Sequence, residues 1–511
     1  MTTSEIGILI AIILYMVGVI GIGIYFSKKS NNTGDFYLGG RKLGPLVTAM
    51  SAEASDMSSW LLMGLPGLAY LSGICEPLWT AIGLAIGTYL NWLIVAKRLR
   101  KYTVICNNSI TIPDFFANRY RDKKILKCVS ALIIIIFFVP YTASGFAACG
   151  KLFNSLFGID YMTAMIISAI VIVAYTTLGG FLAASTSDFI QSIVMTIALA
   201  VVLIYGIISV GGIDEVMNNV KDLPGYIHLN ASYVAKDNTS TPYGTITIFS
   251  TLAWGLGYFG MPHILLRFMA IEDTKKLKLS RRVASIWVVI SMAIAVFIGV
   301  IGHSMSAHGV IGSYNSFDSE TIIVQIAHVL SNHGIFFAIL AGIILAGILA
   351  STMSTSDSQL LAASSSVSEN LLDGVFGLKL SSKAKIIVAR GAVILISIIG
   401  MFLASNPDSS VFQIVSFAWA GFGATFGPVM LFALFWKRSN KYGAISGMIA
   451  GGIMIFVWKF IIRPLGGAWD IYELLPAFIV ASIFIVVVSL LTPAPDREII
   501  AEFESVKNAD I

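Results

Sequence analysis

Long apolar runs alternate with short polar segments along nearly the whole chain. A helix needs about 20 apolar residues to cross the hydrocarbon core of a membrane. Thirteen runs approach or exceed that length, at about residues 5–26, 45–71, 77–96, 127–154, 160–178, 186–210, 244–268, 283–305, 335–360, 386–404, 411–436, 442–463 and 475–492. The pattern therefore predicts an all-α integral membrane protein with about 13 transmembrane helices.

The composition agrees with this pattern. Of the 511 residues, 57% are hydrophobic and 12% are charged, whereas soluble domains carry about 25% charged residues. A soluble protein of this size would expose apolar surface that it has too few polar residues to cover. These figures exclude a soluble enzyme, a nucleic-acid-binding protein and a disordered protein, and they make membrane lipid the surroundings of the chain.

The first apolar run is expected to remain in the mature protein. Residues 1–5, MTTSE, lack the basic segment that begins a signal peptide. Residues 6–26 are long enough to span a bilayer and are followed by Lys28 and Lys29. We interpret this run as a retained first helix.

The basic residues predict an orientation. With the N-terminus outside, 28 of the 33 Lys and Arg residues lie on the inner side or at its membrane edge. The five exceptions are Lys151, Lys221, Lys236, Lys459 and Arg463. Cytoplasmic loops of membrane proteins carry an excess of Lys and Arg. We therefore expect a multi-pass protein of the cell membrane (plasma or inner membrane), with its N-terminus outside and its C-terminus in the cytoplasm.

Two of the apolar runs are interrupted by helix-breaking residues. Residues 51–67 read SAEASDMSSWLLMGLPG, and residues 254–263 read WGLGYFGMPH. Glycine and proline disfavour a helix by about 1 and 3 kcal/mol, and within lipid a broken backbone is tolerated only where it lines a cavity or is buried in protein. Glycines that merely let helices pack closely are the simpler explanation for one such run. Two of them, five runs apart, favour an inverted-repeat transporter with a site near the membrane midplane.

This spacing divides the chain into six parts. Runs two to six and seven to eleven would form the two repeats, and helices 2 and 7 would be discontinuous. The expected parts are a first helix and inner loop at 1–44, repeat 1 at 45–210, an outer loop at 211–243, repeat 2 at 244–436, two further helices at 437–492 and a tail at 493–511. The outer loops at 211–243 and 306–334 are polar enough to hold short helices or a gate.

Several polar groups lie inside the predicted spans. A charge near the bilayer centre costs at least about 2.5–3.5 kcal/mol, so each calls for a reason. Asp56 lies in the second run, Asp188 begins the sixth, and residues 351–359, STMSTSDSQ, follow an apolar stretch in the ninth. Na⁺ is a hard cation that takes oxygen ligands, which hydroxyls, carboxylates and freed backbone carbonyls supply. A proton carried by Asp56, Asp188 or Asp357 would fit the same pattern.

The chain lacks the motifs of membrane enzymes and pumps. It has no H-E-x-x-H, no G-x-S-x-G and no P-loop, so we expect neither an intramembrane protease nor an ATP-driven pump. A channel would be favoured by continuous rings of charge, whereas the charges here cluster at helix breaks. No appended signalling domain and no obligate protein partner are evident.

Several motifs together resemble one transporter family. They are residues 39–67, Tyr141–Gly145, Gly179–Ala183, Trp254–Leu265, Met353–Thr355, Ala418–Ala424 and Gly427–Pro428. In these residues the chain closely resembles the sodium/solute symporter family, and within it the proline branch. The resemblance implies a leucine-transporter-like 5+5 inverted repeat with three additional helices. It also implies Na⁺-coupled secondary import of L-proline by alternating access, with no organic cofactor. A same-fold sodium symporter for another small organic solute is the alternative.

The resemblance also implies a set of site residues. One Na⁺ would lie between the second and ninth runs, on main-chain carbonyls of Ala54, Met57 and Ser351 and on the hydroxyls of Ser354 and Thr355. The solute would contact Ser58, Trp60, Gly64, Tyr141, Trp254, Tyr258 and Pro262. Asp56, Asp188 and Arg41 match positions that serve Na⁺ binding or coupling.

Two positions depart from the family pattern. Glu53 stands where a small residue is expected, so it adds a local charge or a salt-bridge partner. Asp357 and Ser358 stand where uncharged residues are expected. Because Asp357 lies one helical turn beyond Ser354, we expect it to face Asp188 and to form a second cation site near the cytoplasmic exit.

Overall fold

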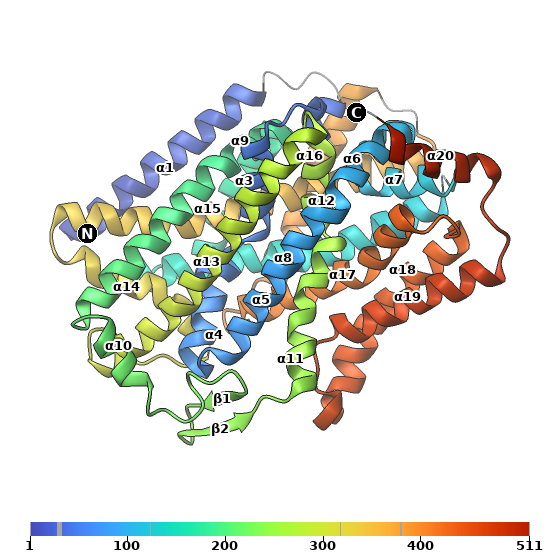
Figure 1. Ribbon diagram of the computed structural model, residues 1–511. Coiled ribbons are helices and arrows are strands. Elements are labelled where there is room, and N and C mark those ends of the chain that lie inside the picture. The colour runs from blue at the N-terminus through green and yellow to red at the C-terminus, as the bar shows by residue number, and fades with distance from the viewer. Residues whose placement is uncertain (1, 28–32, 123, 317, 379–380, 510–511) are drawn as a thin grey trace.

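The chain folds into a helical bundle, described here from a computed structural model (Figure 1). The structure describes residues 2–27, 33–122, 124–316, 318–378 and 381–509. Four of the basic residues assigned to the inner side, Lys28, Lys29, Lys123 and Lys379, lie outside the described residues.

The first half of the chain contains helices α1 to α10 and a short hairpin. Their bounds are α1 Thr3–Ser27, α2 Thr33–Leu38, α3 Pro45–Asp56, α4 Leu65–Ser72, α5 Cys75–Leu90, α6 Ala96–Ile105, α7 Ile112–Arg119, α8 Ile125–Phe157, α9 Tyr161–Ser209, α10 Ile213–Val220, β1 Ala231–Val234 and β2 Thr239–Pro242. The short elements η1 Gly39–Arg41, η2 Trp60–Gly64 and η3 Asn91–Val95 lie between them.

The second half contains helices α11 to α20. Their bounds are α11 Thr245–Leu252, α12 Pro262–Ala270, α13 Leu277–Ala307, α14 Ile322–Ser331, α15 Ile335–Ser365, α16 Ser382–Leu403, α17 Val411–Phe435, α18 Lys441–Val457, α19 Leu474–Leu491 and α20 Arg497–Asn508. The short elements are η4 Ala253–Phe259, η5 Thr274–Lys276, η6 Ser319–Thr321, η7 Ser366–Val375, η8 Trp458–Ile462, η9 Arg463–Leu465 and η10 Gly467–Trp469.

Ten helices of the described chain are long and apolar enough to cross a membrane. Shorter apolar helices occur at Trp60–Ser72, Tyr161–Ala174 and Thr245–Phe259. These three coincide with the second, fifth and seventh predicted runs, two of which contain the glycine and proline interruptions. The prediction of a mostly helical protein with many membrane helices is therefore confirmed.

Two helix breaks interrupt the predicted spans, and the second has a local cause in the sequence. After α3, Met57 leaves the helical conformation (φ −74°, ψ 65°), and the chain becomes helical again at Trp60. Between η4 and α12, Met261 is extended (φ −76°, ψ 108°), and Pro262 begins α12 at a position where its missing N–H costs nothing. Gly257 permits the close approach of α17, because a Cβ there would lie 1.9 Å from Nε1 of Trp419.

The fifth and sixth predicted runs join at a glycine kink. α9 continues from Tyr161 to Ser209, and its helical geometry is broken at Gly180 (φ 68°, ψ −174°). Glycine adopts a positive φ without the steric cost that a side chain would add. The predicted boundary between these two runs is therefore a sharp bend and not a loop.

Large apolar side chains cover the outside of the bundle and polar groups are buried inside it, the opposite of the arrangement in a soluble protein. Large apolar side chains such as Leu14, Ile208 and Phe402 are 68%, 69% and 77% exposed. By contrast, α3, whose last residue is Asp56, packs against α9, α12, α13 and α15 in the interior. An apolar exterior around buried polar groups is what a lipid environment selects.

The two segments predicted to be outer loops contain the expected short helices and one unexpected feature. The segment 211–243 holds α10, and 306–334 holds α14. The first loop also contains the antiparallel β1–β2 hairpin, with Ala231 opposite Pro242, so the all-α prediction missed these strands. Figure 1 shows the hairpin at the opposite end of the bundle from the C-terminal helix α20.

Candidate ion and solute site

Asp56 is the meeting point of three of the predicted aromatic residues. The hydroxyl of Tyr258 donates to the Asp56 carboxylate over 2.5 Å. The indole N–H of Trp60 (3.1 Å) and the hydroxyl of Tyr141 (3.4 Å) both donate to the Asp56 carbonyl. That carbonyl lies at the end of α3, where an α-helical partner is missing, and it also accepts from the Ser58 backbone N–H over 2.8 Å. The aromatic side chains therefore satisfy the break, and the second carboxylate oxygen, Oδ1, is buried without a partner among the described residues.

Trp254 belongs to an aromatic layer beside this group. Its ring centroid lies 6.2 Å from that of Trp60 and 5.4 Å from that of Phe412. Tyr472 stacks on it at 5.0 Å with an interplanar angle of 19°. Trp419 fixes the backbone below by donating its indole N–H to the Trp254 carbonyl over 2.8 Å. The predicted aromatic set is thus brought together, with Phe412, Trp419 and Tyr472 added to it.

Three of the predicted solute-binding residues also have structural roles in the helix breaks. They are Ser58, Gly64 and Pro262. Oγ of Ser58 accepts a hydrogen bond from the Trp60 N–H over 3.4 Å. A Cβ on Gly64 would lie 3.1 Å from Cβ of Phe412, so the room made by this glycine is filled by that side chain. Pro262 begins α12. These contacts hold the break together.

The hydroxyls of α15 reach the break in α3. Oγ of Ser354 lies 2.7 Å from the Ala54 carbonyl oxygen and 3.2 Å from that of Ser351. One helical position away, Oγ1 of Thr355 is buried with no partner among the described residues. A buried hydroxyl that lacks a partner is costly. An oxygen-seeking cation beside Thr355, Ser354 and Ala54 would remove that cost.

Asp188 is held by a cation that the sequence pattern does not single out. Nη2 of Arg267 donates to Oδ2 of Asp188 over 3.1 Å. Ser51 lies between them, since its hydroxyl donates to the same oxygen over 2.7 Å and accepts from Nε of Arg267 over 3.0 Å. Arg267 and Asp188 are 1% and 0% exposed. In the sequence, Arg267 is only one of many inner-edge basic residues.

Asp357 and Ser358 join the same cluster. Nη2 of Arg267 also donates to Oγ of Ser358 over 2.6 Å, and that hydroxyl lies 3.1 Å from Oδ1 of Asp357. Oδ2 of Asp357 and Oδ1 of Asp188 are both buried without a partner among the described residues. Two carboxylates therefore share one guanidinium, which leaves the cluster one positive charge short of neutrality when both acids are ionised.

Glu53 and Arg41 contact neither cluster in the expected way. Glu53 is buried and accepts from the indole N–H of Trp92 over 2.9 Å. Its partner is this neutral donor, so among the described residues Glu53 forms no salt bridge, and the alternative, a local charge, stays a prediction. Arg41 donates to the Met269 and Ser109 carbonyls, each over 2.7 Å. Arg41 thus ties the segment before α3 to the C-terminal end of α12 and to the loop between α6 and α7.

One pocket opens above the aromatic layer. It has a volume of about 580 Å³ and is lined from one side by Trp254 and Phe412 and from the other by Lys459, Arg463 and Tyr472. Trp60, Tyr141 and Tyr258, by contrast, are each 1% exposed. The aromatic layer therefore separates an open pocket from a closed site around Asp56.

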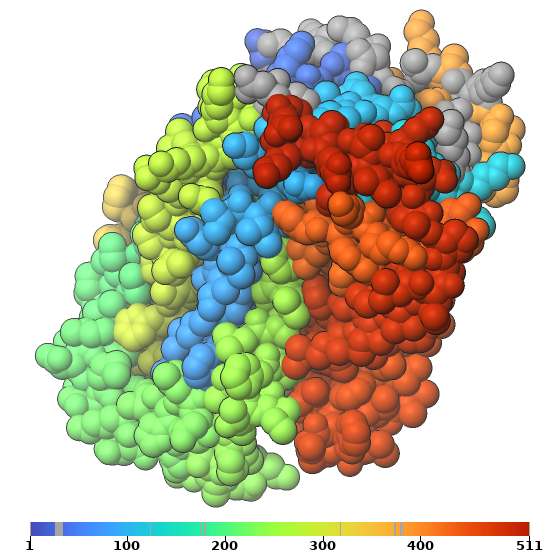
Figure 2. All heavy atoms as spheres, turned by 45° about the vertical axis from the view of Figure 1, so that its right-hand side comes forward, coloured from blue at the N-terminus to red at the C-terminus, as the bar shows by residue number. Residues whose placement is uncertain are grey.

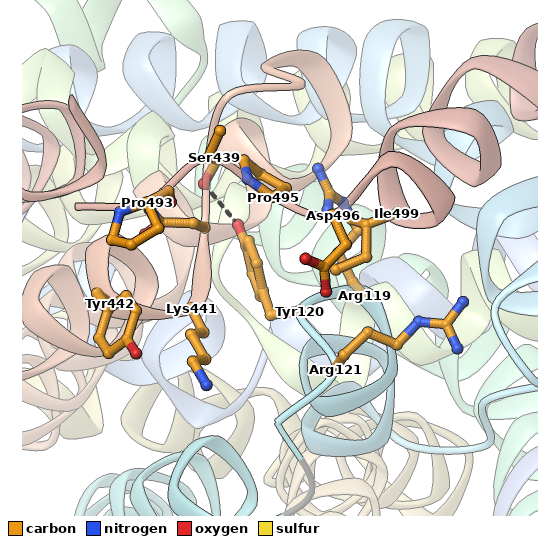
Figure 3. Close-up of a pocket in the computed structure, with 12 residues that line it drawn as sticks. Arg119, Tyr120, Arg121, Ser439, Lys441, Tyr442, Pro493, Pro495, Asp496 and Ile499 are labelled. Carbon is orange, nitrogen blue, oxygen red and sulfur yellow. Dashed lines mark hydrogen bonds between the residues drawn. The ribbon is translucent and has the colours of Figure 1, made fainter.

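A second pocket, of about 210 Å³, lies between α7, the start of α18 and the segment before α20. Figure 3 shows the hydrogen bond between Tyr120 and Ser439 at its centre, measured at 2.9 Å. The basic groups of Arg119, Arg121 and Lys441 point in different directions. Cations that diverge do not form one anion site, and Arg121 is already paired with Glu502 at 2.8 Å.

Comparison with known proteins identifies the family. Residues 36–451 match the sodium:solute symporter family. The chain belongs to this family. Among similar members, the sodium/proline symporter of Haemophilus influenzae is 42% identical and the alignment covers 98% of both chains. The osmoregulated proline transporter OpuE of Bacillus subtilis is 41% identical, with 96% of each chain covered. Members of this symporter family move a solute together with Na⁺ and belong to membranes.

Solved transporter structures share the fold. The structure of a Na⁺-coupled sialic acid symporter in a substrate-bound outward-open state has a TM-score of 0.78 at 17% identity, covering 96% of this chain and 99% of that chain. The structure of MhsT in complex with L-phenylalanine has a TM-score of 0.55 at 12% identity, covering 88% and 98%. At these identities the likeness describes the fold of the symporter, and its solute is a separate question.

Proposed function

We propose that this symporter imports L-proline together with Na⁺ by alternating access. The observation that carries the proposal is the contact between the two elements expected to hold Na⁺: the hydroxyl of Ser354 on α15 lies 2.7 Å from the Ala54 carbonyl at the break of α3. A cation bound there would bridge the two elements. The proline transporters that are 41–42% identical over nearly the whole chain support the choice of solute.

The proposed Na⁺ ligands are the oxygens around this contact. They are the main-chain carbonyls of Ala54, Met57 and Ser351 and the hydroxyls of Ser354 and Thr355. When Na⁺ binds, the Ser354 hydroxyl turns its hydrogen away from Ala54 and offers a lone pair. Thr355 gains the partner that it lacks among the described residues. Both changes favour the bridged state, so Na⁺ stabilises the arrangement of α3 and α15 that the solute then uses.

The proposed solute site lies beside the two breaks. Trp60, Tyr141, Trp254 and Tyr258 surround it, with Ser58, Gly64 and Pro262 shaping the backbone. Aromatic faces suit the apolar ring of proline, and its cationic secondary amine is attracted to a π-system. Asp56 adds a buried carboxylate whose Oδ1 has no partner among the described residues. Asp188, Asp357 and Ser358 form the proposed second cation site, and Arg41 is a coupling residue through its bonds to the inner end of α12.

The proposed architecture has 13 membrane spans. Ten long helices and three shorter apolar helices support this number. Residues 45–210 and 244–436 are the two repeats of a 5+5 core with discontinuous helices 2 and 7, and 1–44, 211–243, 437–492 and 493–511 are the remaining parts. The positions of the hairpin and α20 at opposite ends support an outer loop at 211–243 and a cytoplasmic C-terminus (Figure 1). An odd number of spans then leaves the N-terminus outside.

The driving force follows from the charge of Na⁺. One charge moving down 100 mV releases about 2.3 kcal/mol, enough for accumulation of a few tens-fold before any Na⁺ gradient is added. No covalent chemistry takes place.

The deciding experiment is labelled L-proline uptake into proteoliposomes, with Na⁺, Li⁺ or H⁺ gradients imposed in turn. We expect concentrative uptake with the Na⁺ gradient. Competition by unlabelled amino acids, sugar acids and vitamins tests the solute, and stronger inhibition by one of these would assign the transporter to that solute. Uptake that only equilibrates proline across the membrane would contradict coupling.

A further inference from the structure

A groove runs between α9 and α13 on the part of the molecule that is expected to face lipid. It has a volume of about 330 Å³. α13 contributes six lining side chains between Val283 and Ile294, α9 contributes Thr196 and Leu199, and α3 contributes Met50. Both α13 and the second part of α9 are long and apolar enough to cross a membrane. The groove therefore opens toward the hydrocarbon of the bilayer, with α3 at its back.

The polar groups that line this groove are already bonded within the protein. The indole N–H of Trp287 donates to Oγ1 of Thr196 over 2.9 Å, and the Ser291 hydroxyl donates to the Trp287 carbonyl over 2.7 Å. The other lining side chains are apolar, and Ile286 and Ile290 at the rim are 61% and 52% exposed. The lining therefore favours an apolar occupant, and the bond from Trp287 to Thr196 fixes the shape of the wall.

Two cations stand at one end of the groove. Lys278 and Arg282 of α13 are exposed, and neither has a hydrogen bond or an ion pair with a described residue. Residues four apart lie on one face of a helix, so Lys278 and Arg282 are in line with Ile286 and Ile290. At 1.5 Å per residue, the distance along the helix from Arg282 to Ile294 is about 18 Å. That length is close to the thickness of the hydrocarbon of one leaflet, about 15 Å.

We propose that this groove binds one anionic phospholipid. Its phosphate pairs with Lys278 and Arg282, because both cations suit a phosphate, and one acyl chain lies along the groove. The N-terminal end of α13 lies at the same end of the bundle as α20 (Figure 1), which is the cytoplasmic end in the proposed orientation, and anionic lipids are concentrated in the cytoplasmic leaflet. Through Met50 the acyl chain contacts α3, the helix that ends at Asp56. The lipid thus contacts one of the two elements that the proposed Na⁺ site bridges.

The headgroup is tested by native mass spectrometry of the full-length protein in detergent, titrated with dioleoyl phosphatidylglycerol or with dioleoyl phosphatidylcholine. The two lipids have the same acyl chains, and we expect one phosphatidylglycerol to be retained at about tenfold lower concentration. Each basic residue near an anionic surface contributes about fivefold in affinity. The variant with both Lys278→Gln and Arg282→Gln should therefore bind phosphatidylglycerol about tenfold or more weakly. The matched control is Lys383→Gln with Arg390→Gln, at two exposed basic residues of α16, which does not line the groove.

The acyl chain is tested with phosphatidylglycerol that carries dibromostearoyl chains, because bromine quenches the fluorescence of a neighbouring indole. In nanodiscs, a small fraction of this lipid should quench the native protein more than the variant Trp287→Phe. Equal quenching of the two would overturn occupation of the groove by the chain.

The titrations can also overturn the headgroup site. Equal retention of the two lipids by the native protein, or an equal loss in the two double variants, would do so. A dimer that retains no lipid and separates in the variant with Ile286→Ser and Ile290→Ser would instead assign the groove to a second copy of the chain. None of these measurements uses Na⁺ or proline, so their outcome is independent of the proposed transport.

Discussion

Arg267 and Asp188 form an ion pair of 3.1 Å in which neither side chain is more than 1% exposed. The pair joins α12 to α9, and Ser51 of α3 lies between the two side chains. A charge left alone in such a place has neither water nor a counter-ion. The pair therefore holds together three elements that the proposed transport cycle must move.

Removing one partner should destabilise the protein strongly. Arg267→Met leaves Asp188 unpaired, and breaking a buried pair in this way costs about 3–5 kcal/mol. We expect a clearly lower Tm of the purified protein, measured by tryptophan fluorescence. The matched control is Glu272→Gln, which breaks the exposed Lys276–Glu272 pair and should leave the Tm unchanged. Equal Tm values for the two variants would contradict a structural role for the buried pair.

The hydroxyl of Ser354 should set the Na⁺ affinity. Ser354→Ala removes one of the proposed Na⁺ ligands. A hydrogen bond or ligand to a charged group contributes about 1.5–3 kcal/mol. The Na⁺ concentration for half-maximal proline uptake should therefore rise about tenfold or more. Ser364→Ala is the matched control on the same helix, because among the described residues that hydroxyl bonds only the Leu361 carbonyl of its own helix. Uptake in both variants is measured against Na⁺ at saturating proline. A shift of the same size in both would contradict the assignment.

Asp357 should extend cation binding beside Arg267 and Asp188. Its Oδ2 has no partner among the described residues, and its Oδ1 is joined through Ser358 to Arg267. Asp357→Asn removes one negative charge while keeping the shape, so we expect a changed Na⁺ activation curve for uptake. Unchanged Na⁺ activation would show that this carboxylate takes no part in cation binding. Asp160→Asn, which removes an exposed helix-capping acid, is the control for loss of charge alone.

The sequence is most informative where the membrane dictates the pattern. Apolar length predicts the spans because the bilayer fixes it. Gly260 and Pro262 flank the break at Met261 for local steric reasons, whereas Gly64 and Pro66 lie further along the chain than the break at Met57. Asp56, Trp60, Tyr141 and Tyr258 are predicted together, and the structure brings them into contact.

Contacts between distant segments could not be predicted in this way. In the sequence, Arg267 is one of many basic residues predicted at the inner membrane edge. Only the folded chain brings it, on α12, next to Asp188. The sequence allows Glu53 to be a salt-bridge partner, but in the folded chain its neighbour is Trp92 of η3. Tyr472 lies beyond the repeats in sequence, and only the folded chain stacks it on Trp254. Side-chain partners of this kind depend on helix packing, which apolar periodicity does not encode.

The bond from Tyr258 to Asp56 should couple the two breaks. Tyr258→Phe removes the only hydroxyl that donates to the Asp56 carboxylate among the described residues, at a cost of about 1.5–3 kcal/mol for a bond to a charged group. We expect proline uptake at limiting Na⁺ to fall about tenfold or more, while the protein stays folded. Tyr233→Phe, which loses a bond to the loop residue Asn238, is the matched control. If both variants retain native uptake, Tyr258 has only a packing role.

Phe503 should hold the C-terminal helix α20 against the rest of the bundle. α20 lies across one end of the molecule (Figure 2), and Phe503 lies beneath the guanidinium groups of Arg98 and Arg119, at 4.6 and 5.2 Å from its ring centroid. Such contacts contribute about 0.5–2 kcal/mol each, in addition to burial of the ring. Phe503→Ala should therefore loosen α20 and speed tryptic cleavage after Arg497 in detergent. The control variant is Glu498→Ala, at an exposed residue of the same helix, and it should be cleaved at the native rate. If the Phe503→Ala and Glu498→Ala variants are cleaved equally fast, Phe503 does not hold the helix.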